Sequence, residues 1–266
     1  MIVEQNNYLT PCKLISGRNI YEYDIRQANI NMLYSYGKIS RELYNQLQNS
    51  PKEYREVTIG KMISIYDDFY STISKGIIKS KKLLVEGNRI REENIVRIAN
   101  DAVYVMSPYP LSRTKFHLTD KIEIEFVCKN HFTSFLQLFN VSIFMETLDD
   151  ENLRIDTKGL GKYADFHEKF LSFLSEILFY EERSMHDITL KSYREFYQAY
   201  INLELDVCYY REFNSNSIFH LKTRSGSTSR VLALQPLLVD DIKVDQLDIG
   251  FNYNVLRELY SILVSR

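Results

Sequence analysis

The sequence contains no tryptophan, few cysteines and no long apolar segment. The three cysteines, Cys12, Cys128 and Cys208, are far apart, which indicates a reducing compartment without a disulfide framework. No apolar run reaches the roughly 18 residues that a membrane span requires, and the first residues lack the basic and apolar regions of a signal peptide. We therefore expect a cytoplasmic protein that does not enter a membrane.

Familiar catalytic signatures are also missing. The chain has no P-loop, no GxSxG nucleophile elbow, no GxGxxG turn, and no Cys or His pair with zinc-ligand spacing. The formal net charge is -2 at pH 7, so the whole chain does not have the composition of a strongly basic nucleic-acid binder. Basic residues do gather locally, as in the segment that contains Lys222, Arg224 and Arg230.

What the chain has is enough apolar material for a substantial core, since 45% of its 266 residues are hydrophobic. Tyrosine is abundant, with 20 residues, and Asn, Ile and Lys are plentiful. Such a composition is typical of an AT-rich genome, for example that of a low-GC bacterium or its phage. In the second case, the compartment would be the cytoplasm of the host.

The hydrophobic pattern changes its period along the chain. It predicts helices over 27–36, 41–48 with Ser40 as N-cap, and 54–84, where Gly60 and Gly76 would bend or break the helix. A β-hairpin is expected over 95–106, followed by strands over 121–129, 131–140 and 141–148 and an extended segment over 154–161. From residue 163 the pattern is mostly helical, with a mixture of strands and loops over 208–239. The fold class is therefore α+β.

Two aspartates differ from the other acidic residues in their context. Asp24 comes at the end of a strand-like run, directly before a helix, and Asp101 stands at the tip of the predicted hairpin. If the two strands are neighbours in one sheet, both carboxylates project from the same edge. Paired carboxylates favour Mg²⁺ or Mn²⁺, and two such ions can activate an attacking 3′-oxygen and neutralise a leaving pyrophosphate.

Each aspartate also has a plainer interpretation. Asp24 could cap the following helix, a contribution of roughly 1 kcal/mol, and Asp101 could be an ordinary turn residue. The order of the two along the chain, with a long helical segment between them, favours the metal-site interpretation.

The segments "YEYDIRQANINML" and "IVRIANDAVYVM" resemble motifs A and C of the palm-domain DNA polymerases of families A and B. "EIEFVCKNHFTSF" and "DTKGLG" are similar to the family-B strand that bears a Lys-x-Tyr element and to its Lys-Gly turn before the thumb. "DQLDIGFNYNVLRELYSIL" is similar to a closing thumb helix. The resemblance implies an antiparallel palm sheet backed by helices over 1–161, reduced fingers at about 38–66, and a thumb-like helical region over 162–266.

The same resemblance implies a set of site residues. Asp24 and Asp101 would be the catalytic and metal-binding residues, and Asn29 would lie near the sugar of the incoming nucleotide. Arg55 and Lys61 are the candidates for binding the triphosphate. The candidates for nucleic-acid contacts are Lys129, Lys158, Lys222 and Arg224, and for each cation an ordinary solvated charge is the alternative. The implied partners are a primer–template and nucleoside triphosphates, and a protein partner is a further option.

The sequence departs from the family pattern in motif C. Ala99 stands where family B has its first aspartate, and Asn100 and Ala102 flank Asp101 in place of the family-A residues. Two function hypotheses follow. The protein is a compact polymerase-like nucleotidyltransferase, or it is a palm that lost catalysis and acts as a phage accessory or inhibitor by binding protein or nucleic acid. An unrelated α+β enzyme is a third alternative.

Overall fold

The computed structural model describes residues 2–149, 152–213, 218–232, 239 and 242–266. The chain forms two compact units. The first unit comprises Met1–Pro11 and Asn19–His131, and the second comprises Cys12–Arg18 and Phe132–Arg266. The division into a palm-like region, 1–161, and a thumb-like region, 162–266, is a functional one and stays a prediction.

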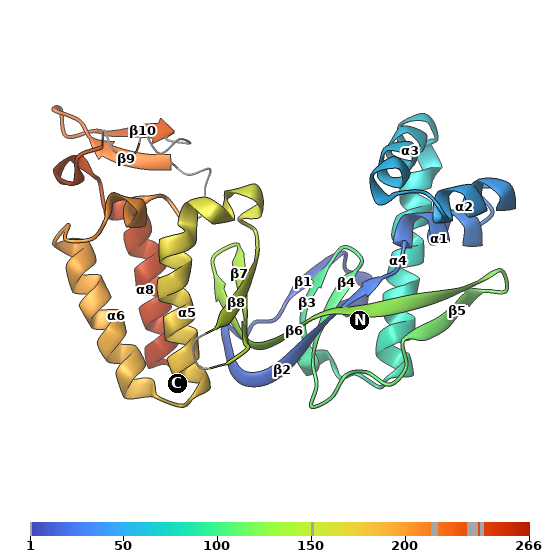
Figure 1. Cartoon of the computed structure of the whole chain (residues 1–266), viewed down its shortest axis with the longest axis horizontal. Helices are drawn as coiled ribbons and strands as arrows, with labels where there is room; N and C mark the ends of the chain where they lie inside the picture. Colours follow the sequence, from blue (N-terminus) through green and yellow to red (C-terminus); the bar gives the residue numbers. More distant parts are fainter. Residues whose placement is uncertain (1, 150–151, 214–217, 233–238, 240–241) are drawn as a thin grey trace. The chain divides into compact units, whose positions relative to one another are not determined.

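An antiparallel sheet forms the centre of the first unit (Figure 1). Its strands follow the order β1-β3-β4-β2-β6, and β5 pairs with β6. The hairpin expected over 95–106 is confirmed as β3 and β4, with Ala99 paired to Ala102. The strand bounds are β1 Asn7–Leu9, β2 Leu14–Ile25, β3 Ile95–Ala99, β4 Ala102–Met106, β5 Lys115–Thr119 and β6 Ile122–Leu138.

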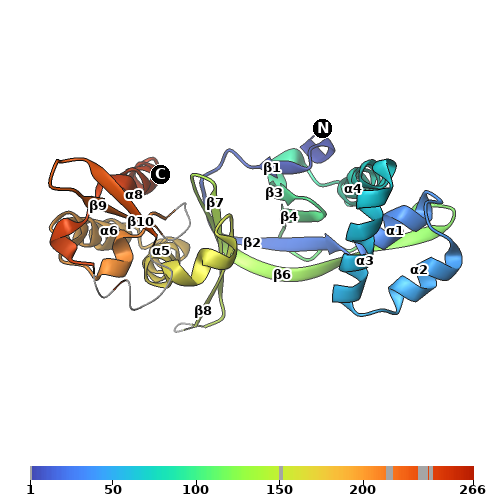
Figure 2. The same cartoon turned by 90° about the horizontal axis from the view of Figure 1, so that it is seen from above.

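The α-helices that follow β2 in the chain gather at the end of the sheet where that strand stops (Figure 2). Ser40 caps the second of them, as expected, because its side chain accepts a hydrogen bond from the Leu43 backbone N–H. The single helix predicted over 54–84 is wrong: the chain breaks at Tyr66, whose backbone is extended, and not at a glycine. The helices are η1 Ile2–Glu4, α1 Ala28–Ser35, α2 Arg41–Gln48, α3 Lys52–Ile65, α4 Asp67–Gly87 and η2 Glu92–Asn94.

Gly60 and Gly76 lie inside continuous helices, and only Gly76 has a packing reason to be glycine. Helix α4 crosses α1 closely there, because a Cβ on Gly76 would overlap the side chain of Met32. Met32 is fully buried in the core that α1 and α4 share with the sheet. The glycine therefore sets how near α4 lies to the helix that follows Asp24.

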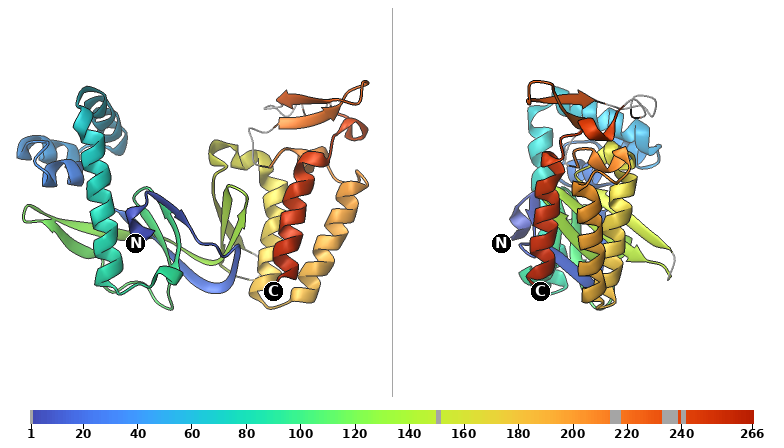
Figure 3. Two further views of the ribbon diagram at one scale, coloured as in Figure 1. Left: turned by 180° about the vertical axis from the view of Figure 1, so that it is seen from behind. Right: turned by 90° about the vertical axis from the view of Figure 1, so that its left-hand side faces the viewer.

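In the second unit, β6 continues into an antiparallel array with β7 and β8, and three long helices pack beside one another (Figure 3). The aromatic segment after residue 163 packs inward as expected, with Phe170 and Phe173 buried. A separate two-stranded sheet contains β9 and β10. The bounds are β7 Val141–Thr147, β8 Leu153–Lys158, η3 Gly161–His167, α5 Glu168–Glu182, α6 His186–Ile201, η4 Val207–Tyr210, β9 Ile218–Lys222, β10 Thr228–Leu232, η5 Val244–Gln246 and α8 Gly250–Val264.

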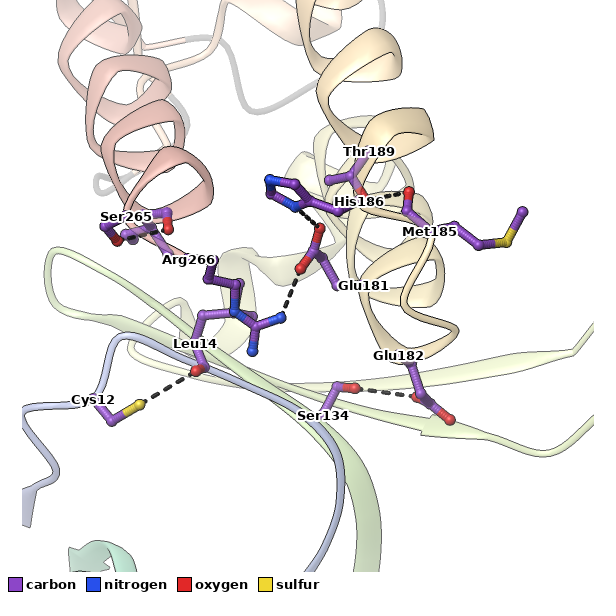
Figure 4. A network of polar contacts seen from close by, with 11 residues as sticks. Cys12, Leu14, Ser134, Glu181, Glu182, Met185, His186, Thr189, Ser265 and Arg266 are labelled. Atoms are coloured by element: carbon purple, nitrogen blue, oxygen red, sulfur yellow. Dashed lines mark hydrogen bonds and ion pairs between the residues drawn. The ribbon is translucent and has the colours of Figure 1, made fainter.

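Glu181 of α5 forms a buried ionic contact in the second unit (Figure 4). Its carboxylate accepts from Nδ1 of His186 at 2.9 Å and from the guanidinium of Arg266 at 2.6 Å, while its side chain is only 2% exposed. Burial alone would raise the pKa of Glu181, but hydrogen bonds from His186, Thr189 and Arg266 hold it below its ordinary value. The contact joins the end of α5 to the residues beyond α8.

The structure confirms the α+β class, with an antiparallel sheet backed by helices. Two details of the strands differ from expectation. The segments 121–129 and 131–140 form one continuous strand, β6, and the strand β5 was not expected. Of the mixed region 208–239, the structure describes β9 and β10, and residues 214–217 and 233–238 lie outside the described part.

Candidate active site

Asp24 is the second-last residue of β2 and pairs in register with Ala102 of β4. It does not cap the next helix: the N-cap of α1 is Gln27, in a left-handed conformation and without a side-chain cap. The helix-cap interpretation of Asp24 is therefore wrong. Its side chain is 13% exposed, and Oδ2 forms an ion pair with the ammonium of Lys129 on β6. Its Oδ1 is buried and has no hydrogen-bond partner among the described residues.

Asp101 stands at the tip of the β3–β4 hairpin, directly after Asn100, whose φ of 52° is left-handed. Asn is one of the few non-glycine residues that adopt this conformation readily, so "ND" is a local signal for the turn. Burial raises the pKa of Asp101. The nearby charge of Glu22 acts in the same direction, whereas a backbone hydrogen bond, Lys81 and Lys52 oppose the increase. Because Asp24 pairs with Ala102, the neighbour of Asp101, both aspartates lie at one end of the β2–β4 pair.

Lys81 of α4 supports the hairpin tip from below the surface. Its side chain is fully buried, and its ammonium donates to the backbone carbonyls of Gln5 and Asn100, each at 3.0 Å. Burial lowers its pKa to about 8, and the charge of Asp101 limits that decrease. Sequence reasoning missed this residue, although a lysine at helical spacing from Ile73 and Ile77 on an apolar stripe was a usable signal.

The two aspartates border one cavity of about 330 Å³ in the first unit. Of the predicted nucleotide-binding residues, Asn29 and Arg55 also line it, and Lys61 does not line it but lies exposed on α3. Arg55 donates to the backbone carbonyl of Ser50 at 2.9 Å. Lys52, which the sequence did not single out, also lines the cavity and pairs with Glu56, a further lining residue, at 3.6 Å.

Two further carboxylates near the aspartates were also missed: Glu56 lines the cavity, and Glu22 lies close to Asp101. Glu22 is on β2, two residues before Asp24, so both side chains project from the same face. Glu22 is 6% exposed, and its carboxylate accepts from the hydroxyl of Tyr104 at 2.7 Å and from the amide of Asn130. Throughout the part of the chain that the structure describes, no group of three or more His, Cys, Asp or Glu residues is arranged to hold a metal ion.

The remaining predicted contacts with nucleic acid belong to the second unit and stay predictions. Lys158 ends β8 and forms an ion pair with Asp156 at 2.8 Å. Lys222 ends β9, and Arg224 is exposed in the turn that leads to β10. Of the four residues predicted to contact nucleic acid, Lys129 lines the cavity.

Fold and cavity together define the class: an α+β protein whose antiparallel sheet presents two aspartates, bordered by basic residues, at the end of a strand pair. A family model described as "Bacteriophage PBS1 gene 130 protein" matches residues 2–226, which is most of the chain. The protein therefore belongs to this bacteriophage family. A search of the curated proteins found no match. In the described residues, none of the helices has the length and apolar character needed to cross a membrane.

Proposed function

We propose that this phage protein is a compact nucleotidyltransferase that adds a nucleotide to a 3′-hydroxyl, with its chemistry centred on Asp24 and Asp101. The observation that carries the proposal is the shared cavity, which the two aspartates line together with Lys52, Arg55 and Glu56 of α3. The resemblance to palm-domain polymerases supports the same assignment, because the strand-then-hairpin order brings motif A and motif C together. The host cytoplasm, where nucleoside triphosphates and template are available, is the proposed place of action.

The carboxylates fit the divalent ions that such chemistry uses. Oδ1 of Asp24 is buried and has no hydrogen-bond partner in the described chain, which is expected of a carboxylate oxygen that coordinates a cation. Mg²⁺ is commonly held by one or two carboxylates together with water and substrate phosphates, so two aspartates suffice without a third. Mg²⁺ or Mn²⁺ bound by Asp24 and Asp101 would supply charge neutralisation at the phosphates and at the attacking oxygen.

The other cavity residues have separate tasks in this proposal. Arg55 and Lys52 bind the triphosphate, the first as a fork of donors and the second as a compact charge. Asn29, on the first turn of α1, contacts the sugar. In the reaction, the bond between the 3′-oxygen and the α-phosphorus forms, the bond to pyrophosphate breaks, and the hydroxyl proton leaves to solvent.

Lys129 has two partners available in turn. Without substrate its ammonium neutralises Asp24, and in the loaded site it contacts a phosphate of the primer or template. Half of its side chain is exposed, with a value of 54%, so it can leave the aspartate at small cost. The lysine would then exchange one anionic partner for another while a divalent ion takes its place at the carboxylate.

The test is incorporation of labelled nucleotides on primer–templates of DNA and of RNA, with and without Mg²⁺ or Mn²⁺. Asp24→Asn and Asp101→Asn should each lower incorporation at least a hundredfold, in line with loss of a charge that acts in the transition state. Asp120→Asn is the matched control, because Asp120 is an exposed turn residue between β5 and β6. Incorporation that persists in both aspartate variants would contradict the assignment.

A second candidate function is a non-catalytic palm that binds protein or nucleic acid as an accessory or inhibitor. The observation that favours it is the presence of lysine side chains around both carboxylates: Lys129 pairs with Asp24, and Lys81 and Lys52 lie near Asp101. These lysines could satisfy the site without any metal. Absence of incorporation under every metal and template condition, with intact folding and tight metal-independent binding to a macromolecule, would support this function over the first.

A further inference from the structure

A groove lined by tyrosine and arginine lies between α6 and α8 of the second unit, outside the cavity of the two aspartates. The two helices lie side by side (Figures 1 and 3) and contact each other. The cavity there measures about 600 Å³. Its lining consists of four tyrosines, two arginines, one serine and one valine: Tyr193, Arg194, Tyr197, Tyr253, Arg257, Tyr260, Ser261 and Val264.

The periodicity of α8 explains why these side chains share one face. The groove residues of α8 follow helical spacing and form one stripe, at positions 253, 257, 260, 261 and 264. The buried residues of the same helix point into the core; they are Val255, Leu256, Leu259 and Leu263. Tyr253 and Tyr260 are 36% and 41% exposed. Seven residues of helix separate them by about 10 Å, which is long enough to accommodate more than one nucleotide.

Packing holds the tyrosine rings in place. Tyr193 is buried, donates its hydroxyl proton to the carbonyl of Leu256 at 2.8 Å, and stacks on Tyr260 with ring centroids 5.4 Å apart. Tyr197 stands between Tyr193 and Tyr253, at centroid distances of 6.0 Å and 6.2 Å. The exposed rings therefore rest on a fixed base, which reduces the entropy lost when a ligand binds.

The positive charge of the groove favours an anionic ligand. None of its described lining residues is Asp or Glu, while Arg194 and Arg257 are exposed and Arg257 lies over the Tyr253 ring at 5.8 Å. The acidic residues nearest along the two helices already have partners: Glu258 pairs with Lys13, and Glu195 pairs with Lys191. A peptide helix would need an apolar strip, and the groove offers one aliphatic side chain, Val264.

We infer that this groove binds single-stranded nucleic acid, with bases stacked on Tyr253 and Tyr260 and backbone phosphates held by Arg194 and Arg257. Proteins that bind single strands without sequence preference combine aromatic faces with a positively charged path for the backbone. A duplex keeps its bases stacked on one another and cannot offer their faces to the tyrosines. The inference does not depend on catalysis at Asp24 and Asp101.

The experiment measures binding of the full chain to fluorescein-labelled oligothymidylate by anisotropy, in EDTA so that no metal-dependent site contributes. Tyr260→Ala should weaken binding roughly five- to 150-fold, the range that loss of one base–aromatic stack produces, and Tyr260→Phe should retain it. Arg257→Ala should reduce the slope of log affinity against log salt by about 0.7. Tyr109→Ala is the control, because Tyr109 is 78% exposed in the first unit.

Two further measurements complete the test. Circular dichroism must show the same helix content in each variant, so that a loss of binding is assigned to the groove. Tighter binding to the single strand than to a duplex of the same length supports the inference. The inference would be overturned if Tyr260→Ala bound the single strand as tightly as wild type, or if wild type bound the single strand and the duplex equally.

Discussion

The ammonium of Lys129 lies against the carboxylate of Asp24, on the neighbouring strands β6 and β2. Lys129 is a predicted phosphate contact, and Asp24 is a predicted metal ligand. While the two are paired, Lys129 is not available to a phosphate and Asp24 is not available to a metal ion. A metal ion that binds at the proposed site would therefore have to displace Lys129 from Asp24.

Lys129→Ala should therefore tighten Mn²⁺ binding about fivefold, which corresponds to the roughly 1 kcal/mol of an ion pair with a half-exposed lysine. Mn²⁺ electron paramagnetic resonance of the unliganded protein measures the affinity directly. Lys121→Ala, an exposed lysine near the start of the same strand, should leave it unchanged. Equal Mn²⁺ affinity in wild type and Lys129→Ala would show that the ion pair does not limit the metal site.

Local sequence signals located both aspartates, because each depends on a few neighbouring residues. The alternation before Asp24 and the "ND" turn at Asp101 specify a strand end and a hairpin tip without reference to the rest of the fold. Their position at one cavity requires the β2–β4 register, which was expected only through the resemblance to polymerase motifs.

The residues that surround the aspartates were not found in this way. Lys52 reaches the cavity through packing of α3, and a tertiary contact of that kind leaves no motif. Lys81 and Glu22 did leave signals, an apolar helical stripe and the alternation of a strand, but neither signal shows by itself that the residue lies near Asp101. The helix break at Tyr66 was missed for a related reason. Glycine lowers helix stability by only about 1 kcal/mol, so packing decides whether a helix continues through it. Here it does so at Gly60 and Gly76.

Buried Lys81 predicts a pH dependence on the alkaline side. Its folded-state pKa of about 8 lies below the ordinary 10.5, so between these values the unfolded chain binds more protons at this group than the folded chain. The contribution of Lys81 to the free energy of unfolding should therefore rise with pH through that window. Lys81→Met should abolish this rise, measured by urea denaturation at several pH values.

Lys79→Met provides the comparison for Lys81. Lys79 lies on the same helix but is exposed, and its ammonium donates to the carbonyl of Leu118 at 2.9 Å. A rise with pH that is lost in Lys81→Met and kept in Lys79→Met would be assigned to the buried lysine. A Lys81→Met profile parallel to wild type would mean that Lys81 titrates at its ordinary pKa in the folded protein.

Glu181 predicts a pH dependence of the same sign on the acid side. Its pKa is held below the ordinary 4.5, so its contribution to stability is complete above that value and is lost as the pH falls through the lower, folded-state pKa. Glu181→Gln should cost about 2 kcal/mol at neutral pH, because charge-assisted hydrogen bonds to His186 and Arg266 are lost, and it should flatten the acid limb. Thermal unfolding from pH 7 to pH 3 would measure both effects. An acid limb in Glu181→Gln as steep as that of wild type would assign it to other carboxylates.

Gly76 and Gly60 predict opposite effects of the same substitution in neighbouring helices. Gly76→Ala places a methyl group onto the fully buried Met32 side chain, which has little room to move, and should destabilise the protein by about 1–3 kcal/mol. Gly60→Ala meets nothing within 4 Å and should stabilise α3 by roughly 0.5–1 kcal/mol, because alanine loses less backbone entropy in a helix. Urea denaturation of both variants gives the two free energies. Since α1 follows Asp24, Gly76→Ala should also lower the proposed nucleotide incorporation. Equal free energies of unfolding for the two variants would show that α1 and α4 do not approach as closely as the structure places them.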